Sequence, residues 1–353
     1  MNLASYRALG RSGLVVSPLG LGTMTFGTAR WGASDDESKA IFDAYVEAGG
    51  NFIDTADVYA GGRSEEMVGR YVARGRLRDR LVLATKASFA TDRGNPHGSG
   101  NGRKHLRQAL EASLRRLGTD YLDLYWVHIW DMVTPVEETL QTLGDFVREG
   151  RVRYFGFSNV PAWYAARAAT LAQVHGVPGP VALQLEYSLV GRDLEREHVA
   201  AARELGLGLT PWSPLAAGFL TGKYTREAGG TGGSAQGEGR LNGPNPFGDT
   251  KFTGRNWHTL EVLKTVAEGV GRPPAQVALA WVVAQPGVTS TIIGASSARQ
   301  LADNLASLEV QLSAEQLKLL GEASTPEAPL FFSDTLRRLI FGGADVQGWL
   351  PQP

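Results

Sequence analysis

The chain has 353 residues, of which 43% are hydrophobic and 20% are charged, as in ordinary folded proteins with a large core. Its 35 lysines and arginines almost balance its 36 aspartates and glutamates, so charge does not favour nucleic acid or an anionic membrane as partner. The absence of cysteine excludes disulfides, thiolate metal sites and a cysteine nucleophile. A small-molecule partner fits this composition best.

The beginning of the chain, MNLASYRALGRSGL, lacks the basic and then apolar stretches of a secretory signal peptide. No apolar run approaches the roughly 18 to 20 residues that a membrane-spanning helix needs. The sequence therefore predicts a cytoplasmic protein, by default rather than from a positive signal.

Eight short apolar runs recur along the chain, with a helical pattern between each run and the next. Continuous rather than alternating apolar runs are typical of parallel strands that are covered on both faces. The expected strands are 18–22, 52–55, 81–86, 122–128, 154–158, 183–187, 207–212 and 290–293. Eight alternating units favour a closed (β/α)₈ barrel, and an open doubly wound sheet is the competing architecture.

The helices between these strands have one apolar face. Leu106, Leu110, Leu114 and Leu117 share a face, and Gly118 is a suitable stop for that helix. Similar patterns occupy about 35–49, 64–74, 136–149, 161–175, 194–205, 257–270 and 298–308, with additional helices at 273–285 and 313–323.

No linker divides the chain, so we expect a single domain over residues 1–353. Two glycine-rich connections, 88–102 and 213–255, are long enough to be functional lids or surface excursions, and both follow strands at the end where barrels place their sites. The extension 325–353 is too apolar for a free tail, and we expect it to cover the barrel mouth or to contact another subunit of a possible homo-oligomer. Its apolar residues are Phe331, Phe332, Leu339, Ile340, Phe341, Trp349 and Leu350.

Four polar residues follow or close neighbouring strands: Asp54 and Tyr59 the second, Lys86 the third and His128 the fourth. Each has a plain structural explanation as a cap, a packed aromatic ring, a surface charge or a core histidine. Together they form a proton donor, because a tyrosine with a pKa of about 10 needs a nearby ammonium to stabilise its anion. Lys86 can do this, Asp54 can keep Lys86 charged, and His128 can direct a carbonyl oxygen to the tyrosine.

These residues lie in the segments NFIDTADVYAGGRSEEMVGRYV, LVLATKA and YLDLYWVHIWD. In these segments, and over almost all of its length, the chain resembles the aldo-keto reductase family, in particular members like the aryl-alcohol dehydrogenases and potassium-channel β-subunits. The resemblance implies that Asp54, Tyr59, Lys86 and His128 are the catalytic tetrad of a (β/α)₈ barrel enzyme. Several motifs in the right order are far more specific than one short pattern.

The resemblance also implies residues that bind a nicotinamide cofactor. In GFSN and QLEYS, Ser158, Asn159 and Gln184 would hold the carboxamide, and Trp212 would stack on the ring. Structurally, Trp212 could be core and Ser158 a helix cap. The remaining cofactor contacts would be Thr23, Ser213, Leu215, Gly218 and Lys223, with Arg240 closing over the pyrophosphate.

In IIGASSARQLADN, the resemblance places the adenosine phosphate at Gly294, Ser296, Gln300, Asp303 and Asn304. Many relatives carry arginine where Gln300 stands, so the expectation is NADP, with NAD not excluded. The dinucleotide fingerprint of an open Rossmann sheet is absent, since Gly20 and Gly22 are not followed by the third glycine.

The expected function is the reversible reduction of an aldehyde or ketone with NADPH. The alternative is a cofactor-sensing regulatory subunit with slow turnover, and an isomerase or lyase on the same barrel is disfavoured by the nicotinamide contacts. Trp31, Phe89 and Trp130 are candidate walls of the substrate pocket, or else core packing, and aromatic walls would favour a bulky or aromatic carbonyl.

Overall fold

Eight parallel strands form one sheet in the order β12-β3-β4-β5-β6-β7-β8-β9. The computed structural model describes residues 1–29, 31–226, 235–236, 240–241, 248–326 and 334–344. The strands are β3 (Leu19–Gly22), β4 (Phe52–Asp54), β5 (Val82–Ala87), β6 (Leu122–Val127), β7 (Val152–Ser158), β8 (Ala182–Gln184), β9 (Gly208–Leu209) and β12 (Thr291–Ile293). Each coincides with one of the eight strands expected from the sequence.

The two ends of this sheet meet. The Thr289 amide donates to the Leu209 carbonyl at 2.8 Å, and the Ile292 amide donates to the Pro211 carbonyl at 2.7 Å. These bonds join the β9 region to β12 and close the sheet on itself. The prediction of a (β/α)₈ barrel is therefore confirmed, and the open doubly wound alternative is wrong.

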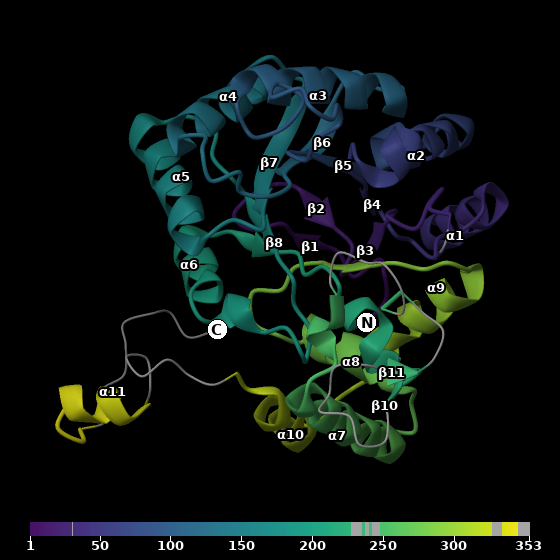
Figure 1. Cartoon of the computed structure of the whole chain (residues 1–353), viewed down its shortest axis with the longest axis vertical. Coiled ribbons are helices and arrows are strands. Elements are labelled where there is room, and N and C mark those ends of the chain that lie inside the picture. The colour runs from purple at the N-terminus through teal and green to yellow at the C-terminus, as the bar shows by residue number, and fades with distance from the viewer. Residues whose placement is uncertain (30, 227–234, 237–239, 242–247, 327–333, 345–353) are drawn as a thin grey trace.

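Helices surround the strands on the outside of the barrel (Figure 1). Gly118, in the left-handed conformation at φ 63°, ends the helix at the residue that the sequence indicates. The helices are α1 (Asp35–Glu47), α2 (Arg63–Gly75), α3 (Arg103–Leu117), α4 (Val136–Arg148), α5 (Ala162–His175), α6 (His198–Leu205), α7 (Gly254–Val270), α8 (Pro274–Val283), α9 (Ala298–Leu305) and α10 (Ala314–Ser324).

A separate apolar cluster fills the inside of the barrel. Trp126 on β6 is fully buried there, and a Cβ atom on Gly156 of β7 would lie 2.4 Å from its ring. Glycine at 156 therefore makes room for the indole. The cluster consists of Leu9, Leu14, Val16, Phe52, Val82, Ala84, Leu124, Trp126, Ala182 and Ile292.

The first three residues of that cluster lie in or beside a hairpin that the sequence analysis missed. Its strands are β1 (Arg7–Ala8) and β2 (Val15–Val16), which pair antiparallel. Because each strand has two residues, there is no alternation to detect in the sequence. A second short hairpin, β10 (Thr225–Arg226) with β11 (Ala235–Gln236), lies in the long connection after β9.

The apolar extension 325–353 contains one described helix, α11 (Asp334–Ile340), which lies to one side of the barrel in Figure 1. Leu339, Ile340 and Phe341 are exposed there. Phe331, Phe332, Trp349 and Leu350 lie outside the described residues. That the extension covers the barrel mouth or another subunit stays a prediction. In the described part of the chain, no helix combines the length and apolar character needed to cross a membrane.

Candidate active site

The alternation of side chains along the strands places a group of polar residues above the apolar filling of the barrel. Residues two apart on a strand face the same side. Phe52, Ala84 and Trp126 point into the barrel. Two positions after each of them stands a polar residue, which is Asp54, Lys86 and His128 respectively. Ser158 and Gln184 stand in the same relation to Gly156 and Ala182. The sequence thus puts five polar side chains at the carboxyl end of the barrel interior.

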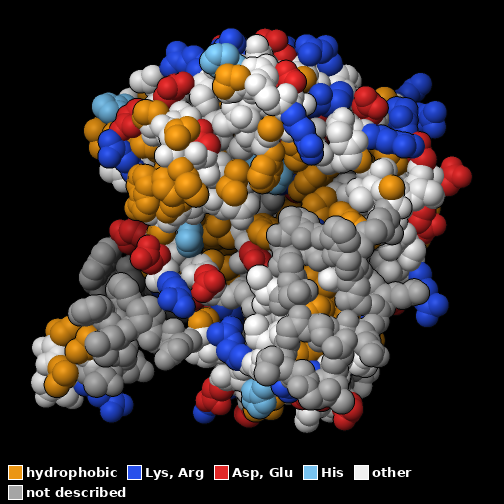
Figure 2. All heavy atoms as spheres, viewed as in Figure 1, with side chains coloured by type: hydrophobic (Ala, Val, Ile, Leu, Met, Phe, Trp, Pro, Cys, Tyr) orange, Lys and Arg blue, Asp and Glu red, His pale blue; other side chains and the backbone are white. Residues whose placement is uncertain are grey.

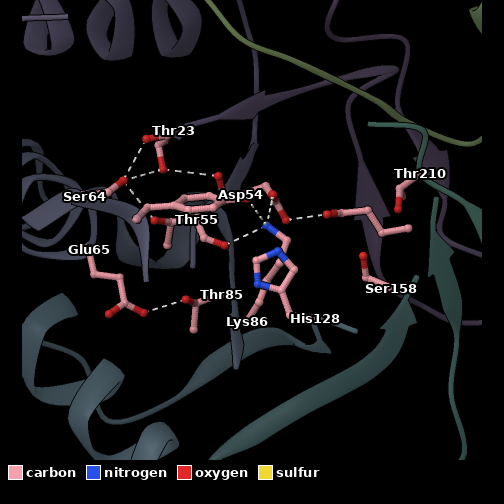
Figure 3. A network of polar contacts seen from close by, with 12 residues as sticks. Thr23, Asp54, Thr55, Ser64, Glu65, Thr85, Lys86, His128, Ser158 and Thr210 are labelled. Atoms are coloured by element: carbon pink, nitrogen blue, oxygen red, sulfur yellow. Dashed lines mark hydrogen bonds and ion pairs between the residues drawn. The ribbon is translucent and has the colours of Figure 1, made fainter. Parts of the chain in front are cut away.

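Lys86 is the centre of this group. Its ammonium is fully buried, forms an ion pair with Asp54, and donates to the Thr55 carbonyl at 2.8 Å (Figure 3). Burial acts to lower the pKa of Lys86, but Asp54 and Tyr59 oppose that effect, and the net pKa is raised. Lys86 is therefore a fixed positive charge beneath the mouth of the barrel.

Tyr59 begins a short 3-10 turn after β4, and its hydroxyl accepts a hydrogen bond from the Lys86 ammonium at 3.3 Å. Burial raises the pKa of Tyr59, and Lys86 acts in the opposite direction. The influence of Lys86 thus has the direction expected from the sequence, but burial outweighs it. Tyr59 carries its proton at neutral pH and is a donor rather than an anion.

His128 meets Tyr59 edge to face, with 6.0 Å between the ring centroids. Burial and the charge of Lys86 lower the pKa of His128 well below its ordinary value, so the imidazole is neutral. Its Nδ1 atom is buried and has no hydrogen-bond partner among the described residues. A neutral imidazole beside a protonated phenol can orient a carbonyl oxygen without competing for the proton.

Asn159 connects the tetrad to Trp212. Its amide nitrogen donates to the His128 carbonyl at 3.0 Å and to the Ser158 hydroxyl at 2.9 Å, and its Oδ1 atom accepts from the Trp212 indole at 3.0 Å. Asn159 has a φ of 50°, which is uncommon for a residue other than glycine and is found at functional sites. The bond to Asn159 fixes the edge of the Trp212 ring.

Two of the expected cofactor residues make hydrogen bonds within the tetrad region. Gln184 donates to the Asp54 carboxylate at 3.0 Å across the barrel. Thr23 is fully buried, and its hydroxyl bonds to the Asp54 carbonyl and to Ser64 (Figure 3). Both support Asp54, and their contact with a cofactor stays a prediction.

The connection after β9 carries two cations, Lys223 and Arg240. Lys223 is exposed and packs against Gly218, where an added Cβ would lie 3.0 Å from the lysine Cε. No carboxylate of the described residues forms an ion pair with Lys223. The Arg240 guanidinium lies 4.5 Å from the centre of the Trp31 ring, and its charge acts to lower the pKa of Tyr59. Leu215 and Ser213 lie in the turn before Lys223, with Ser213 at a φ of 54°.

The segment expected to hold the adenosine phosphate runs from the connection after β12 through most of α9. The Ser296 amide and hydroxyl both donate to the Gln300 side chain, at 2.9 and 3.0 Å. Asn304 donates to the Gly294 carbonyl at 3.1 Å, and Asp303 is exposed.

Aromatic side chains line the rim next to His128. Phe89 is 42% exposed, and the centroids of its ring and the His128 ring are 4.7 Å apart. Trp130 contacts Trp163 of α5 at 5.6 Å, and Trp163 is 53% exposed. Figure 2 shows hydrophobic side chains gathered around a hollow in the middle of this face. Trp163 was not expected from the sequence, where its only signal was an aromatic residue in the helix that follows β7.

A second group of charges lies behind the tetrad and was also missed. Asp57 and Glu65 are both buried, and Glu65 pairs with Arg116 at 2.6 Å. Burial, together with the charge of Glu65, raises the pKa of Asp57 to about 7, although Arg116 and Lys86 oppose the shift. The only signal in the sequence was a second aspartate close to Asp54 and Tyr59.

Asp57→Asn is expected to stabilise the protein increasingly as the pH rises. Between pH 3.8 and about 7 the folded chain keeps a proton on Asp57 that the unfolded chain releases, so wild-type stability falls across this range. The variant lacks this loss, which can reach about 4 kcal/mol at pH 8. Urea unfolding at pH 5 and pH 8 measures the difference. Asp79→Asn, at an exposed carboxylate, is the control. If Asp57→Asn and the wild type differ in the free energy of unfolding by the same amount at both pH values, Asp57 does not keep its proton in the folded chain.

Comparison with known proteins identifies the family. The profile of the aldo/keto reductase family matches residues 18–325. The chain belongs to the aldo/keto reductase family. Membership of this family supports the prediction that the protein is an oxidoreductase, with a nicotinamide cofactor and small carbonyl compounds as substrates.

Several family members are similar over most of their length. An uncharacterized oxidoreductase, YrpG, of Bacillus subtilis (strain 168) is 36% identical over 92% of this chain and 98% of its own. The norsolorinic acid reductase stcV of Emericella nidulans is 37% identical over 87% of this chain and 78% of its own. A probable voltage-gated potassium channel subunit beta of Oryza sativa subsp. japonica is 36% identical, over 86% of this chain and 91% of its own length.

Proposed function

We propose that this protein reduces an aldehyde or ketone to the alcohol, reversibly and with NADPH, and that Tyr59 donates the proton. The observation that carries the proposal is the Tyr59 hydroxyl, 3.3 Å from a buried lysine that is itself paired with Asp54. Few other chemistries need a protonated phenol beside a permanent ammonium.

When bound, the nicotinamide supplies a hydride to the carbonyl carbon. The carbonyl oxygen gains the Tyr59 proton as the O–H bond of the phenol breaks. Lys86 stabilises the phenolate through its hydrogen bond, and Asp54 keeps Lys86 charged. His128 orients the carbonyl oxygen toward Tyr59. In the oxidation of an alcohol the same residues work in reverse.

The residues around the tetrad fit such a cofactor. The Trp212 ring, held at its edge by Asn159, is proposed to stack on the flat nicotinamide. Lys223, with no carboxylate partner in the described chain, and Arg240 supply positive charge on the side where a pyrophosphate would lie. Ser158, Asn159 and Gln184 are proposed to hold the carboxamide.

The rim favours an aromatic or otherwise bulky carbonyl substrate. Phe89, Trp130 and Trp31 are its proposed walls, and Phe89 is already in contact with His128. The similarity to a relative named aryl-alcohol dehydrogenase agrees with an aromatic substrate class.

The loss of NADPH absorbance with a panel of aromatic and aliphatic aldehydes and ketones tests this function. We expect turnover with at least one class and faster reaction with the aromatic compounds. Oxidation of the matching alcohol with NADP tests reversibility. A protein that binds NADPH but turns over none of the carbonyls would contradict the proposed enzyme.

The second candidate is a regulatory subunit that senses its cofactor, supported by the similarity to probable potassium channel β-subunits. An intact tetrad does not separate the two functions. The rate of cofactor release does, because an enzyme releases NADP within its turnover time, whereas a sensing subunit keeps it bound. A cytoplasmic location, a single domain, and the lack of a nucleic-acid partner stay predictions from the sequence.

A further inference from the structure

A carboxylate from α1 is hydrogen-bonded to the first turn of α9. The Ala298 amide, the first of α9, donates to Glu37 Oε1 at 2.7 Å, although 261 positions separate the two residues. The closed barrel allows this contact, because α1 follows β3 and α9 follows β12, which are neighbours in the sheet. Figure 1 shows the two helices side by side.

Two further backbone amides near this turn also have hydrogen-bond acceptors within the protein. The Gln300 amide donates to the Ser297 cap at 3.2 Å, and the Ser296 amide donates to the Gln300 side chain. The start of a helix carries a partial positive charge and attracts an anion. In α9 that anion is the side chain of Glu37.

In (β/α)₈ barrels, phosphate groups often bind at the loops after the seventh and eighth strands and at the start of a short helix there. The corresponding strands here are β9 and β12, and the helix is α9. Under the proposed function, and as the family resemblance implies, the adenosine phosphate of the cofactor would lie beside Ser296 and Gln300. A 2′-phosphate at this point would meet the Glu37 carboxylate, whereas a 2′-hydroxyl could donate a hydrogen bond to it.

We propose that Glu37 narrows the preference of this protein for NADPH over NADH, because its carboxylate repels the 2′-phosphate of NADPH and can accept a hydrogen bond from the 2′-hydroxyl of NADH. The inference rests on the proposed function, since it concerns the same cofactor site. It assigns cofactor choice to a residue of α1 outside the residues expected to grip the adenosine phosphate. Two like charges repel at close range, and a carboxylate is a good acceptor for a ribose hydroxyl.

Glu37→Gln is the sharpest test, because glutamine keeps an oxygen that can accept from the Ala298 amide but removes the charge. Calorimetric titrations would compare NADPH with NADH, and adenosine 2′,5′-bisphosphate with AMP, for the wild type and the variant. Asp36→Asn makes the same charge change at the exposed neighbouring residue and is the control. None of these measurements depends on turnover.

We expect Glu37→Gln to tighten the binding of NADPH and of the bisphosphate by about fivefold, the size of one charge interaction near a surface. NADH and AMP should bind as before or up to about twofold more weakly. Asp36→Asn should leave the ratio of NADPH affinity to NADH affinity unchanged. An unchanged ratio in Glu37→Gln, or an equal change in Asp36→Asn, would overturn the inference. If the wild type binds neither NADPH nor NADH, the proposed function fails as well.

Discussion

Tyr59→Phe is expected to lower kcat for carbonyl reduction by about 10² to 10⁴-fold, the contribution of a positioned general acid. Phenylalanine keeps the ring that meets His128 edge to face at 6.0 Å, so the walls of the site should be preserved. What is lost is the hydroxyl that lies 3.3 Å from Lys86. The rate of NADPH oxidation at saturating substrate measures the effect.

Tyr6→Phe is the control, since it makes the same substitution at a tyrosine that is 47% exposed. Binding of NADPH to the Tyr59→Phe protein, followed by fluorescence, should match that of the wild type. Unchanged turnover would show that the proton comes from another group. A simultaneous loss of cofactor binding would show that the ring had moved.

Lys86→Met is expected to lower the free energy of unfolding by about 3 to 5 kcal/mol. The substitution leaves the Asp54 carboxylate, 2% exposed, without its counter-charge. It also removes the donor to the Thr55 carbonyl. Urea unfolding at pH 7 measures the loss, and reductase activity should disappear with it.

The double variant Asp54→Asn/Lys86→Met separates the cost of an unpaired charge from the loss of packing. Because it buries no unpaired charge, we expect it to recover most of the stability lost in Lys86→Met while staying inactive. If the double variant is as unstable as the single one, the ion pair is not what holds this part of the barrel together.

The strands and most helices of this protein could be predicted because their signals are local. Continuous apolar runs mark strands that are covered on both sides, and Gly118 marks a helix end through its own backbone conformation. The exceptions are equally physical. The strands of the β1–β2 hairpin are too short for any period, and the helix expected from residue 194 begins at His198, after a 3-10 turn over Asp193–Glu195.

The candidate tetrad was also accessible from the sequence. Asp54, Lys86 and His128 each stand two positions beyond an inward-facing residue of a strand, so the local period of two aims them into the barrel. The sequence did not indicate the relative size of the effects on Tyr59, where burial outweighs Lys86 in setting the pKa. Burial depends on everything packed around a group, and no local pattern records it.

By itself, the sequence determined the alternation of strands and helices and the polar residues at the strand ends, because these depend on neighbours along the chain. Only the tertiary structure decided which distant groups meet. Closure of the barrel brings Gln184 to Asp54 across 130 positions and Glu37 to Ala298 across 261. It also encloses Asp57 beside Glu65. Such contacts depend on the register and curvature of the whole sheet, which short-range patterns do not specify.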